Sequence, residues 1–228
     1  MNEKIEHSKR VFLSPSRLSL FKECKRCFWQ EVNKGLRRPS GAFPSLPGGM
    51  DIALKKLFDK HRLNGCLPVE IQNKLEGHLF SDMQKLDVWR NNFKGLQYID
   101  EDTGVGLRGA LDDLFVTDDG CHIPLDFKTR GFPLKDNTAD YYQHQMNLYS
   151  YLLGKNGMKV GNFACLLFYH PTEAEGNGRF RFAVDLVKVK TSTQDAEKLF
   201  KDAIETLRGS EPDSDSNCGW CNWLTEYR

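Results

Sequence analysis

The chain has 228 residues, 39% of them hydrophobic, which is enough to bury one substantial core. The formal net charge of +1 excludes a strongly basic protein, so any binding of nucleic acid would need a local basic patch. No apolar run approaches the ~20 residues that a membrane-spanning helix needs, and the polar N-terminus is unlike a secretory signal. We therefore expect a cytoplasmic protein with no membrane partner.

Hydrophobic periodicity predicts a mixed α/β protein. The predicted order is a helix over 14–32, a helix over 50–63, helical sequence over 68–93, strands within 96–116 and 121–129, a helix over 139–157, strands over 162–171 and 179–189, and a helix over 193–209. The strand 162–171 is apolar at nearly every position, as expected of a strand covered on both faces of a sheet. Neither an internal repeat nor a low-complexity segment interrupts this order.

Four of the seven cysteines form two C-x-x-C pairs. Cys24 and Cys27 lie in the first predicted helix, and Cys218 and Cys221 lie near the C-terminus. In a chain without a secretory signal, such cysteines are expected to be reduced thiols or metal ligands. Four thiolates in two close pairs suit either one tetrahedral Zn²⁺ or a [4Fe–4S] cluster. A shared site would join the two ends of the chain, so its predicted role is structural.

The segment Gly109–Gly131 places acidic residues and a lysine in strand-forming sequence. Residues two apart in a strand project from one face, so Asp126 and Lys128 are predicted to lie together. Asp112 lies on the preceding strand of a predicted hairpin, and its carboxylate is expected to approach that of Asp126. Two such carboxylates suit Mg²⁺ or Mn²⁺. The lysine would then orient a water molecule or stabilise charge on a phosphate.

A lone D-x-K pattern also occurs on ordinary solvated strand faces, but here other motifs accompany it. Gly109 precedes Asp112 by three positions, and Gln145 and Tyr149 stand on one face of the following predicted helix. With these motifs in this order, nearly the whole chain resembles the PD-(D/E)XK nuclease superfamily. The resemblance is to the RecB-like branch, which includes CRISPR-associated adaptation nucleases and the AddB nuclease domain. It implies a restriction-endonuclease-like α/β core, in which helices flank a central mixed sheet.

The resemblance assigns roles to the matching residues. The aspartate of the G-x-x-D motif corresponds to Asp112, since only the glycine spacing separates it from its neighbour Asp113. The (D/E)-x-K motif corresponds to Asp126 and Lys128. In such folds the backbone carbonyl between these two residues, here that of Phe127, commonly completes the metal shell. The predicted metal ligands are therefore the two aspartates and this carbonyl.

Two further correspondences concern the helices. The Q-x-x-x-Y motif corresponds to Gln145 and Tyr149, because the competing Gln143 has no tyrosine one helical turn further on. Many RecB-like nucleases place a histidine metal ligand near the start of the helix predicted over 50–63, where this chain has Asp51. This aspartate is a candidate third oxygen ligand. It is equally interpreted as an acidic residue favoured by the helix dipole.

The resemblance also bears on the cysteines and on the domain organisation. The sequence "SPSRLSLFKECKRCFW" is similar to a phrase that often opens this family, and relatives bind an iron–sulfur cluster through one N-terminal and three C-terminal cysteines. This chain has two and two. Spacing favours zinc and the resemblance favours iron–sulfur, so a [4Fe–4S] cluster is predicted, with Zn²⁺ as the alternative. A flexible segment 1–10 and a single nuclease domain over 11–228, with both ends forming the Cys₄ site, are expected.

The implied activity is metal-dependent hydrolysis of phosphodiester bonds in DNA, with exonuclease action favoured. The expected substrate is DNA of single-stranded character, and protein partners in DNA repair or CRISPR-associated DNA processing are a further prediction. Candidate phosphate contacts are Lys34, Arg37, Arg38 and Arg130. A catalytically silent DNA-binding or assembly subunit that keeps the fold is the alternative, and an RNA-directed hydrolase would use the same residues.

Overall fold

The computed structural model describes residues 10–39, 41 and 44–226. These residues form two compact units. Among the described residues, the first unit comprises 10–39, 97–108 and 199–226, and the second comprises 41, 44–96 and 109–198. The segment expected to be flexible, 1–10, lies outside the described residues apart from Arg10. The single domain expected over 11–228 stays a prediction.

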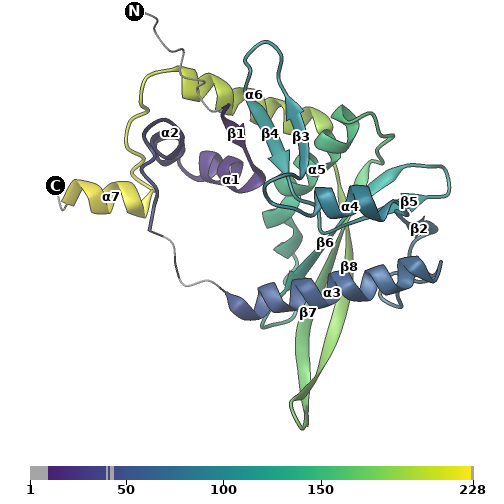
Figure 1. The fold of residues 1–228 in the computed structure, drawn as a ribbon. Coiled ribbons are helices and arrows are strands. Elements are labelled where there is room, and N and C mark those ends of the chain that lie inside the picture. The colour runs from purple at the N-terminus through teal and green to yellow at the C-terminus, as the bar shows by residue number, and fades with distance from the viewer. Residues whose placement is uncertain (1–9, 40, 42–43, 227–228) are drawn as a thin grey trace, which may run out of the picture. The chain divides into compact units, whose positions relative to one another are not determined.

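A five-stranded mixed sheet forms the centre of the second unit (Figure 1). Its strands, in spatial order, are β2 (Gly77–Leu79), β5 (Asp113–Thr117), β6 (His122–Thr129), β7 (Phe163–Gly176) and β8 (Arg179–Lys190). Strands β6 and β7 run parallel, whereas every other pair of neighbours in this sheet is antiparallel. The predicted α/β fold with a central mixed sheet is confirmed.

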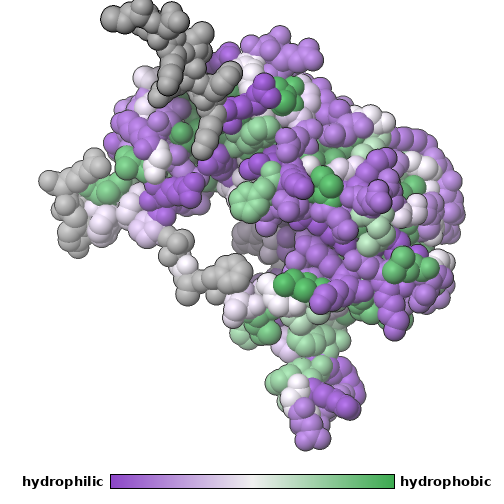
Figure 2. Space-filling model, viewed as in Figure 1, coloured by the Kyte–Doolittle hydropathy of each residue, from purple (hydrophilic) through white to green (hydrophobic). Residues whose placement is uncertain are grey.

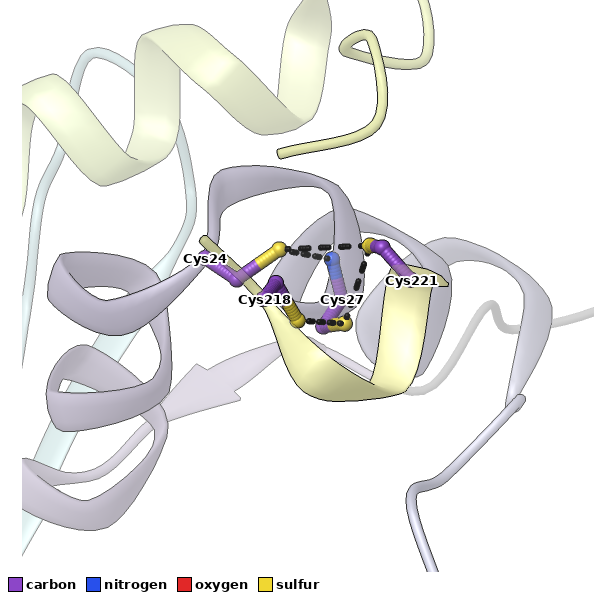
Figure 3. A group of neighbouring side chains, drawn as sticks. All are labelled: Cys24, Cys27, Cys218 and Cys221. Carbon is purple, nitrogen blue, oxygen red and sulfur yellow. Dashed lines mark hydrogen bonds between the residues drawn. The ribbon is translucent and has the colours of Figure 1, made fainter. Parts of the chain in front are cut away.

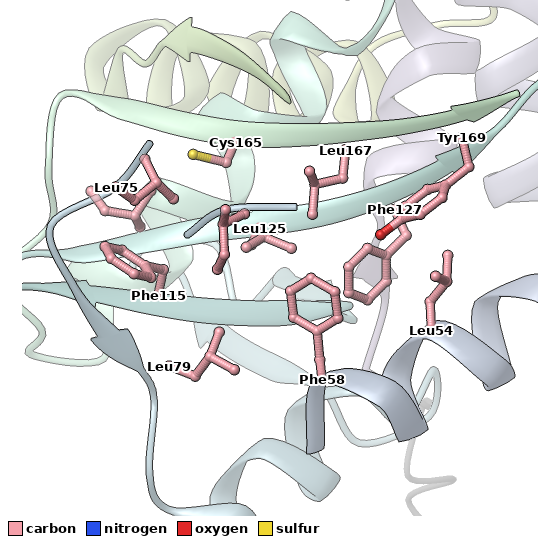
Figure 4. Close-up of a cluster of buried hydrophobic side chains, with 12 residues drawn as sticks. Leu54, Phe58, Leu75, Leu79, Phe115, Leu125, Phe127, Cys165, Leu167 and Tyr169 are labelled. Carbon is pink, nitrogen blue, oxygen red and sulfur yellow. The ribbon is translucent and has the colours of Figure 1, made fainter. Parts of the chain in front are cut away.

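Helices cover both faces of this sheet. They are α3 (Ser45–Leu63), α4 (Met83–Trp89), the 3₁₀ helix η1 (Thr138–Tyr142) and α5 (Gln143–Lys155). From α3, Leu54 and Phe58 enter the core beside Phe127 of β6, and the two aromatic rings meet edge to face at 4.7 Å (Figure 4). From α5, Gln145 reaches Asp126 on the opposite face of β6. On β6, Phe127 therefore packs in the core, whereas its neighbour Asp126 makes polar contacts on the other face.

Strands β7 and β8 form a long antiparallel hairpin that extends beyond the rest of the sheet (Figure 1). The pairing is irregular between Pro171 and Glu173 and again between Ala174 and Gly176. The face of the molecule seen in Figure 2 is mostly hydrophilic, with apolar side chains scattered across it. Scattered apolar residues are ordinary on a protein surface and by themselves indicate no binding site.

The first unit holds a small sheet and the helices that carry the cysteine pairs. The strand order in the sheet is β1 (Phe12–Leu13), β4 (Gly106–Gly109), β3 (Leu96–Ile99). The helices are α1 (Pro15–Glu23), α2 (Lys25–Lys34) and α7 (Gly219–Glu226). Helix α6 (Thr193–Arg208) contains residues of both units. Ser14 caps α1 by accepting a hydrogen bond from the Arg17 N–H, and Pro15 suits the first helical position. Gly35 ends α2 in the left-handed conformation, with φ of 69°.

Two predicted helices differ from the structure. The helix expected over 14–32 is broken at Cys24, which is extended and caps α2 through its own sulfur. The helical sequence expected over 68–93 instead contains turns, strand β2 and the short helix α4. Gly77 permits the close approach of β2 to β5, because it has φ of 140° and a Cβ there would stand 2.1 Å from the Val116 carbonyl oxygen. Within the described residues, no helix is both long enough and apolar enough to cross a membrane.

Candidate functional site

The β5–β6 hairpin brings the predicted acidic residues together. The Gly120 N–H donates to the Thr117 carbonyl at 2.8 Å and reverses the chain between the two strands. Asp112 lies immediately before β5, and its Oδ2 accepts a 3.0 Å hydrogen bond from the Phe127 N–H. This bond places the Asp112 carboxylate beside the backbone that joins Asp126 to Lys128.

Asp126 is 2% exposed and forms an ion pair with Lys128. Burial and the negative charge of Asp112 raise the pKa of the Asp126 carboxyl to about 7, although Lys128 acts in the opposite direction. Burial alone would lower the pKa of Lys128, but the two aspartates more than offset it and the pKa is raised. Lys128 is therefore a cation that forms an ion pair with Asp126 and is also stabilised by the charge of Asp112.

Helix α5 adds Gln145 and Tyr149 to this group. The Gln145 amide donates to the Tyr149 hydroxyl at 2.8 Å and to Asp126 at 3.4 Å, and its oxygen accepts from Lys128 at 3.3 Å. Gly109 permits the approach of α5, because a Cβ there would stand 3.0 Å from the Tyr149 ring. Burial raises the pKa of Tyr149 well above its usual value, with the two aspartates acting in the same direction. Tyr149 is thus a neutral hydrogen-bonding group.

The competing glutamine lies elsewhere. Gln143 donates to the side chain of Asn147 at 2.8 Å and to the Lys190 carbonyl at 2.7 Å. These bonds tie α5 to the end of β8. The structure therefore brings Gln145, and not Gln143, into contact with the D-x-K residues.

Helix α3 supplies Asp51 and a lysine that the sequence analysis missed. The Nζ of Lys55 lies 2.7 Å from Asp51 and 2.9 Å from Asp112. Burial lowers the pKa of Lys55, but Asp112 and Asp51 more than offset this effect and the pKa is raised. Asp51 is therefore linked to Asp112 through an ammonium group. The only sequence signal was the spacing of four between Asp51 and Lys55 on one helix face.

Asp113, the rival of Asp112, is buried in a network of charges. It pairs with Arg62 and, at 3.0 Å, with Arg90, and Asp59 also contacts both arginines. Arg90 donates through its Nε to the Asp112 carbonyl at 2.8 Å. The charges of these four side chains are thus paired within the network, and Arg90 also binds the backbone of Asp112, the predicted metal ligand. Asp113 contributes to the framework of the site, and Asp112 presents its carboxylate to it.

The donor set fits a divalent cation of the magnesium type. Asp112 and Asp126 offer hard carboxylate oxygens, and the raised pKa of Asp126 reflects unfavourable negative charge that a cation would relieve. In the described part of the chain, only Cys24, Cys27, Cys218 and Cys221 place ligand atoms from three or more residues all within 4.8 Å of one another. The carboxylates of Asp51, Asp112 and Asp126 therefore do not form a group as compact as the cysteines. Lys55 forms ion pairs with both Asp51 and Asp112.

The model of the PD-(D/E)XK nuclease superfamily matches residues 50–225, which include every residue of this carboxylate, lysine and glutamine group. The chain belongs to the PD-(D/E)XK nuclease superfamily. The superfamily generally comprises nucleases that use divalent metals, so the fold implies nucleic acid as substrate. No curated protein matches the chain. A solved structure, that of the protein SSO0001, has 14% identity and a TM-score of 0.46, over 98% of this chain and 85% of that one.

The four paired cysteines lie together in the first unit, and the family match does not reach Cys24 or Cys27 (Figure 3). All four are buried. The Cys24 and Cys221 sulfurs are 3.7 Å apart, and the Cys27 sulfur lies 3.7 Å from that of Cys218 and 3.8 Å from that of Cys221. The predicted association of the two pairs is confirmed as a cluster that could hold a metal.

The remaining candidate phosphate contacts are distributed between the two units. Lys34 pairs with Glu211 at 2.6 Å, and Arg38 contacts Glu23 and Cys218, so both already have acidic or thiol partners. Arg130 follows β6 in the second unit, and its guanidinium lies over the Phe168 ring at 5.9 Å. Of these residues, Arg130 is therefore the one placed immediately after the D-x-K strand.

Proposed function

We propose that this protein is a metal-dependent deoxyribonuclease. One observation carries the proposal: Asp126, Lys128 and Gln145 are in mutual contact, and Asp112 is fixed beside them by the Phe127 N–H. These are the residues that match the motifs of the family resemblance, and they come from the residue before β5, from β6 and from α5. Chance pairing on a solvated strand face does not account for a carboxylate as buried as Asp126.

Asp112 and Asp126 would hold Mg²⁺ or Mn²⁺, together with the Phe127 carbonyl and with Asp51 as a further candidate. When bound, the ion supplies a Lewis acid for the scissile phosphate and lowers the pKa of a coordinated water. Lys128 would position the attacking water or stabilise negative charge that develops on the phosphate. Gln145 holds the Lys128 ammonium in place through its side-chain oxygen, and Tyr149 fixes Gln145 in turn.

We place the protein in the RecB-like branch, acting as an exonuclease on DNA of single-stranded character. The support is the Q-x-x-x-Y pair on α5, which contacts the D-x-K strand, and the paired cysteines at the two ends of the chain. DNA repair or CRISPR-associated DNA processing, with protein partners, is the corresponding setting. A catalytically silent subunit is the second candidate, and the ion pairs of Lys55 and Lys128 with the aspartates are compatible with it.

Substrate class is tested with DNA and RNA oligonucleotides labelled at either end, each as a single strand and as a duplex. We expect single-stranded DNA to be degraded progressively from one end in Mg²⁺ or Mn²⁺, and to be stable in EDTA. Release of short labelled products from only one end would identify the polarity. Preferential cleavage of RNA would overturn the DNA assignment, and internal cleavage of a circular single strand would overturn the exonuclease assignment.

The raised pKa of Asp126 predicts a pH dependence of stability. Folded protein retains the Asp126 proton up to about pH 7, whereas an unfolded aspartate loses it near ~3.9. Without metal, stability should therefore fall as pH rises across this interval, because the folded state binds more protons there. Asp126→Asn cannot ionise and should lose less stability over the same interval.

Thermal unfolding at about pH 5 and about pH 8, with and without Mn²⁺, measures this effect. Mn²⁺ should raise the Tm of the unmodified protein more at the higher pH, where proton competition for Asp126 is absent. It should have little effect on Asp126→Asn at either pH. Identical pH profiles for the two proteins would contradict a raised Asp126 pKa.

A further inference from the structure

The cysteine cluster of the first unit has dimensions that distinguish between its two candidate occupants. We infer that Cys24, Cys27, Cys218 and Cys221 form a site for one tetrahedral Zn²⁺ rather than for a [4Fe–4S] cluster. The inference stands on the first unit alone and is independent of the proposed nuclease activity. It favours Zn²⁺ over the [4Fe–4S] cluster that the family resemblance implies.

The sulfur–sulfur distances carry the argument. Four thiolates about 2.3 Å from one tetrahedral zinc ion are roughly 3.8 Å from one another. The distances here are 3.7, 3.7 and 3.8 Å, and all four sulfurs lie within 4.8 Å of one another. Each thiolate of a [4Fe–4S] cluster binds a different iron at a corner of the core, so those sulfurs must stand further apart. Figure 3 shows the four cysteine side chains gathered together, with their sulfurs close to one another.

The backbone around the sulfurs is organised in the same way at both pairs. Cys24 caps α2, and the Cys27 N–H donates to the Cys24 sulfur at 3.4 Å. Cys218 precedes α7, and the Cys221 N–H donates to the Cys218 sulfur. Both pairs therefore place thiolates at helix N-termini, where backbone N–H groups and the helix dipole stabilise negative charge. This arrangement also explains why the predicted helix over 14–32 breaks at Cys24.

Arg38 completes the surroundings of the site. Four thiolates around a divalent ion leave two excess negative charges, and the Arg38 Nη2 donates to the Cys218 sulfur at 3.0 Å. Glu23 holds the other arm of the same guanidinium. We assign Arg38 to support of the metal site through Cys218, in place of the phosphate contact expected from the sequence. Leu20 and Trp220 pack against the sulfurs and complete the enclosure.

The occupant is identified on unmodified full-length protein, produced and purified without oxygen so that an oxygen-sensitive cluster would survive. We expect one zinc ion per chain and no acid-labile sulfide. Protein refolded with Co²⁺ should show the visible bands of tetrahedral thiolate coordination, and these bands should disappear when zinc is added. Iron and sulfide in equal amounts, with broad visible absorbance, would overturn the inference, as would protein that binds neither metal.

The assigned residues are tested by zinc affinity, measured by competition with a chromophoric chelator. Arg38→Met should weaken zinc binding by about 10-fold to 100-fold, the range for outer partners of metal ligands, while keeping the four-sulfur cobalt spectrum. Cys24→Ser should change that spectrum to three-sulfur coordination. Cys66→Ser, at an exposed cysteine outside the cluster, is the matched control and should behave as the unmodified protein. An unchanged affinity in Arg38→Met would refute its assigned role.

Discussion

Lys128→Met should reduce the rate of DNA hydrolysis by at least ~10²-fold while Mn²⁺ binding is retained. The physical reason is the division of roles within the site. Asp112 and Asp126 offer the oxygens that a hard cation needs, whereas Lys128 offers only a positive charge beside them. Removing the ammonium leaves the ligands in place but removes the group that acts on water or phosphate.

Asp126→Ala provides the contrast, because it should lose Mn²⁺ binding and hydrolysis together. Isothermal titration with Mn²⁺ and single-turnover hydrolysis measure the two properties on the same preparations. Lys159→Met is a matched control, since this lysine pairs with the exposed Asp119 at 3.0 Å and not with the site. Loss of Mn²⁺ binding in Lys128→Met, or unchanged hydrolysis, would show that the roles are divided differently.

Asp113→Ala should destabilise the protein by about 3–5 kcal/mol, since it removes one partner from a buried ion-pair network. Asp113 is fully buried between Arg62 and Arg90, and its loss leaves the two guanidinium groups with Asp59 as the one carboxylate of this network that contacts both. Burial raises the pKa of Asp113 even beside these two arginines, which is itself a sign of how costly an unpaired charge would be there.

Urea unfolding followed by circular dichroism measures the free energy of unfolding of this variant. Asp119→Ala is the control, because Asp119 lies on the β5–β6 turn with an exposed side chain and should be nearly neutral when replaced. If Asp113→Ala unfolds at the same urea concentration as the unmodified protein, the network does not hold the framework. A second replacement, Arg90→Met, should also reduce hydrolysis, because Arg90 binds the Asp112 carbonyl.

The side chains of β6 were predictable because strand geometry alone places Asp126 and Lys128 on one face and Phe127 on the other. The turn at Thr117–Gly120 was equally predictable from its Asp and Gly content. Strand geometry and the turn, together with the order of the G-x-x-D and Q-x-x-x-Y motifs, are enough to predict most residues of the candidate site. Each depends on residues that are close in sequence or on a motif of fixed spacing.

The missed features depend on contacts between distant segments. Arg62 and Asp113 are 51 residues apart, and neither position differs in sequence from an ordinary surface charge. Lys55 looks like one of several lysines on an amphipathic helix until α3 packs against the sheet beside Asp112. Likewise, strand β2 pairs with β5, and this tertiary pairing overrides the local helical preference of the segment.

Cleavage of labelled single-stranded DNA tests the assignment of Asp112, Asp126 and Lys128 as the catalytic group of a metal-dependent nuclease. The unmodified protein is compared with Asp112→Ala in Mg²⁺, in Mn²⁺ and in EDTA. We predict hydrolysis by the unmodified protein in either metal, none in EDTA, and none by Asp112→Ala under any of the three conditions. Equal cleavage by both proteins, or cleavage that persists in EDTA, would rule out this assignment, and absence of cleavage by metal-loaded unmodified protein would favour the silent subunit.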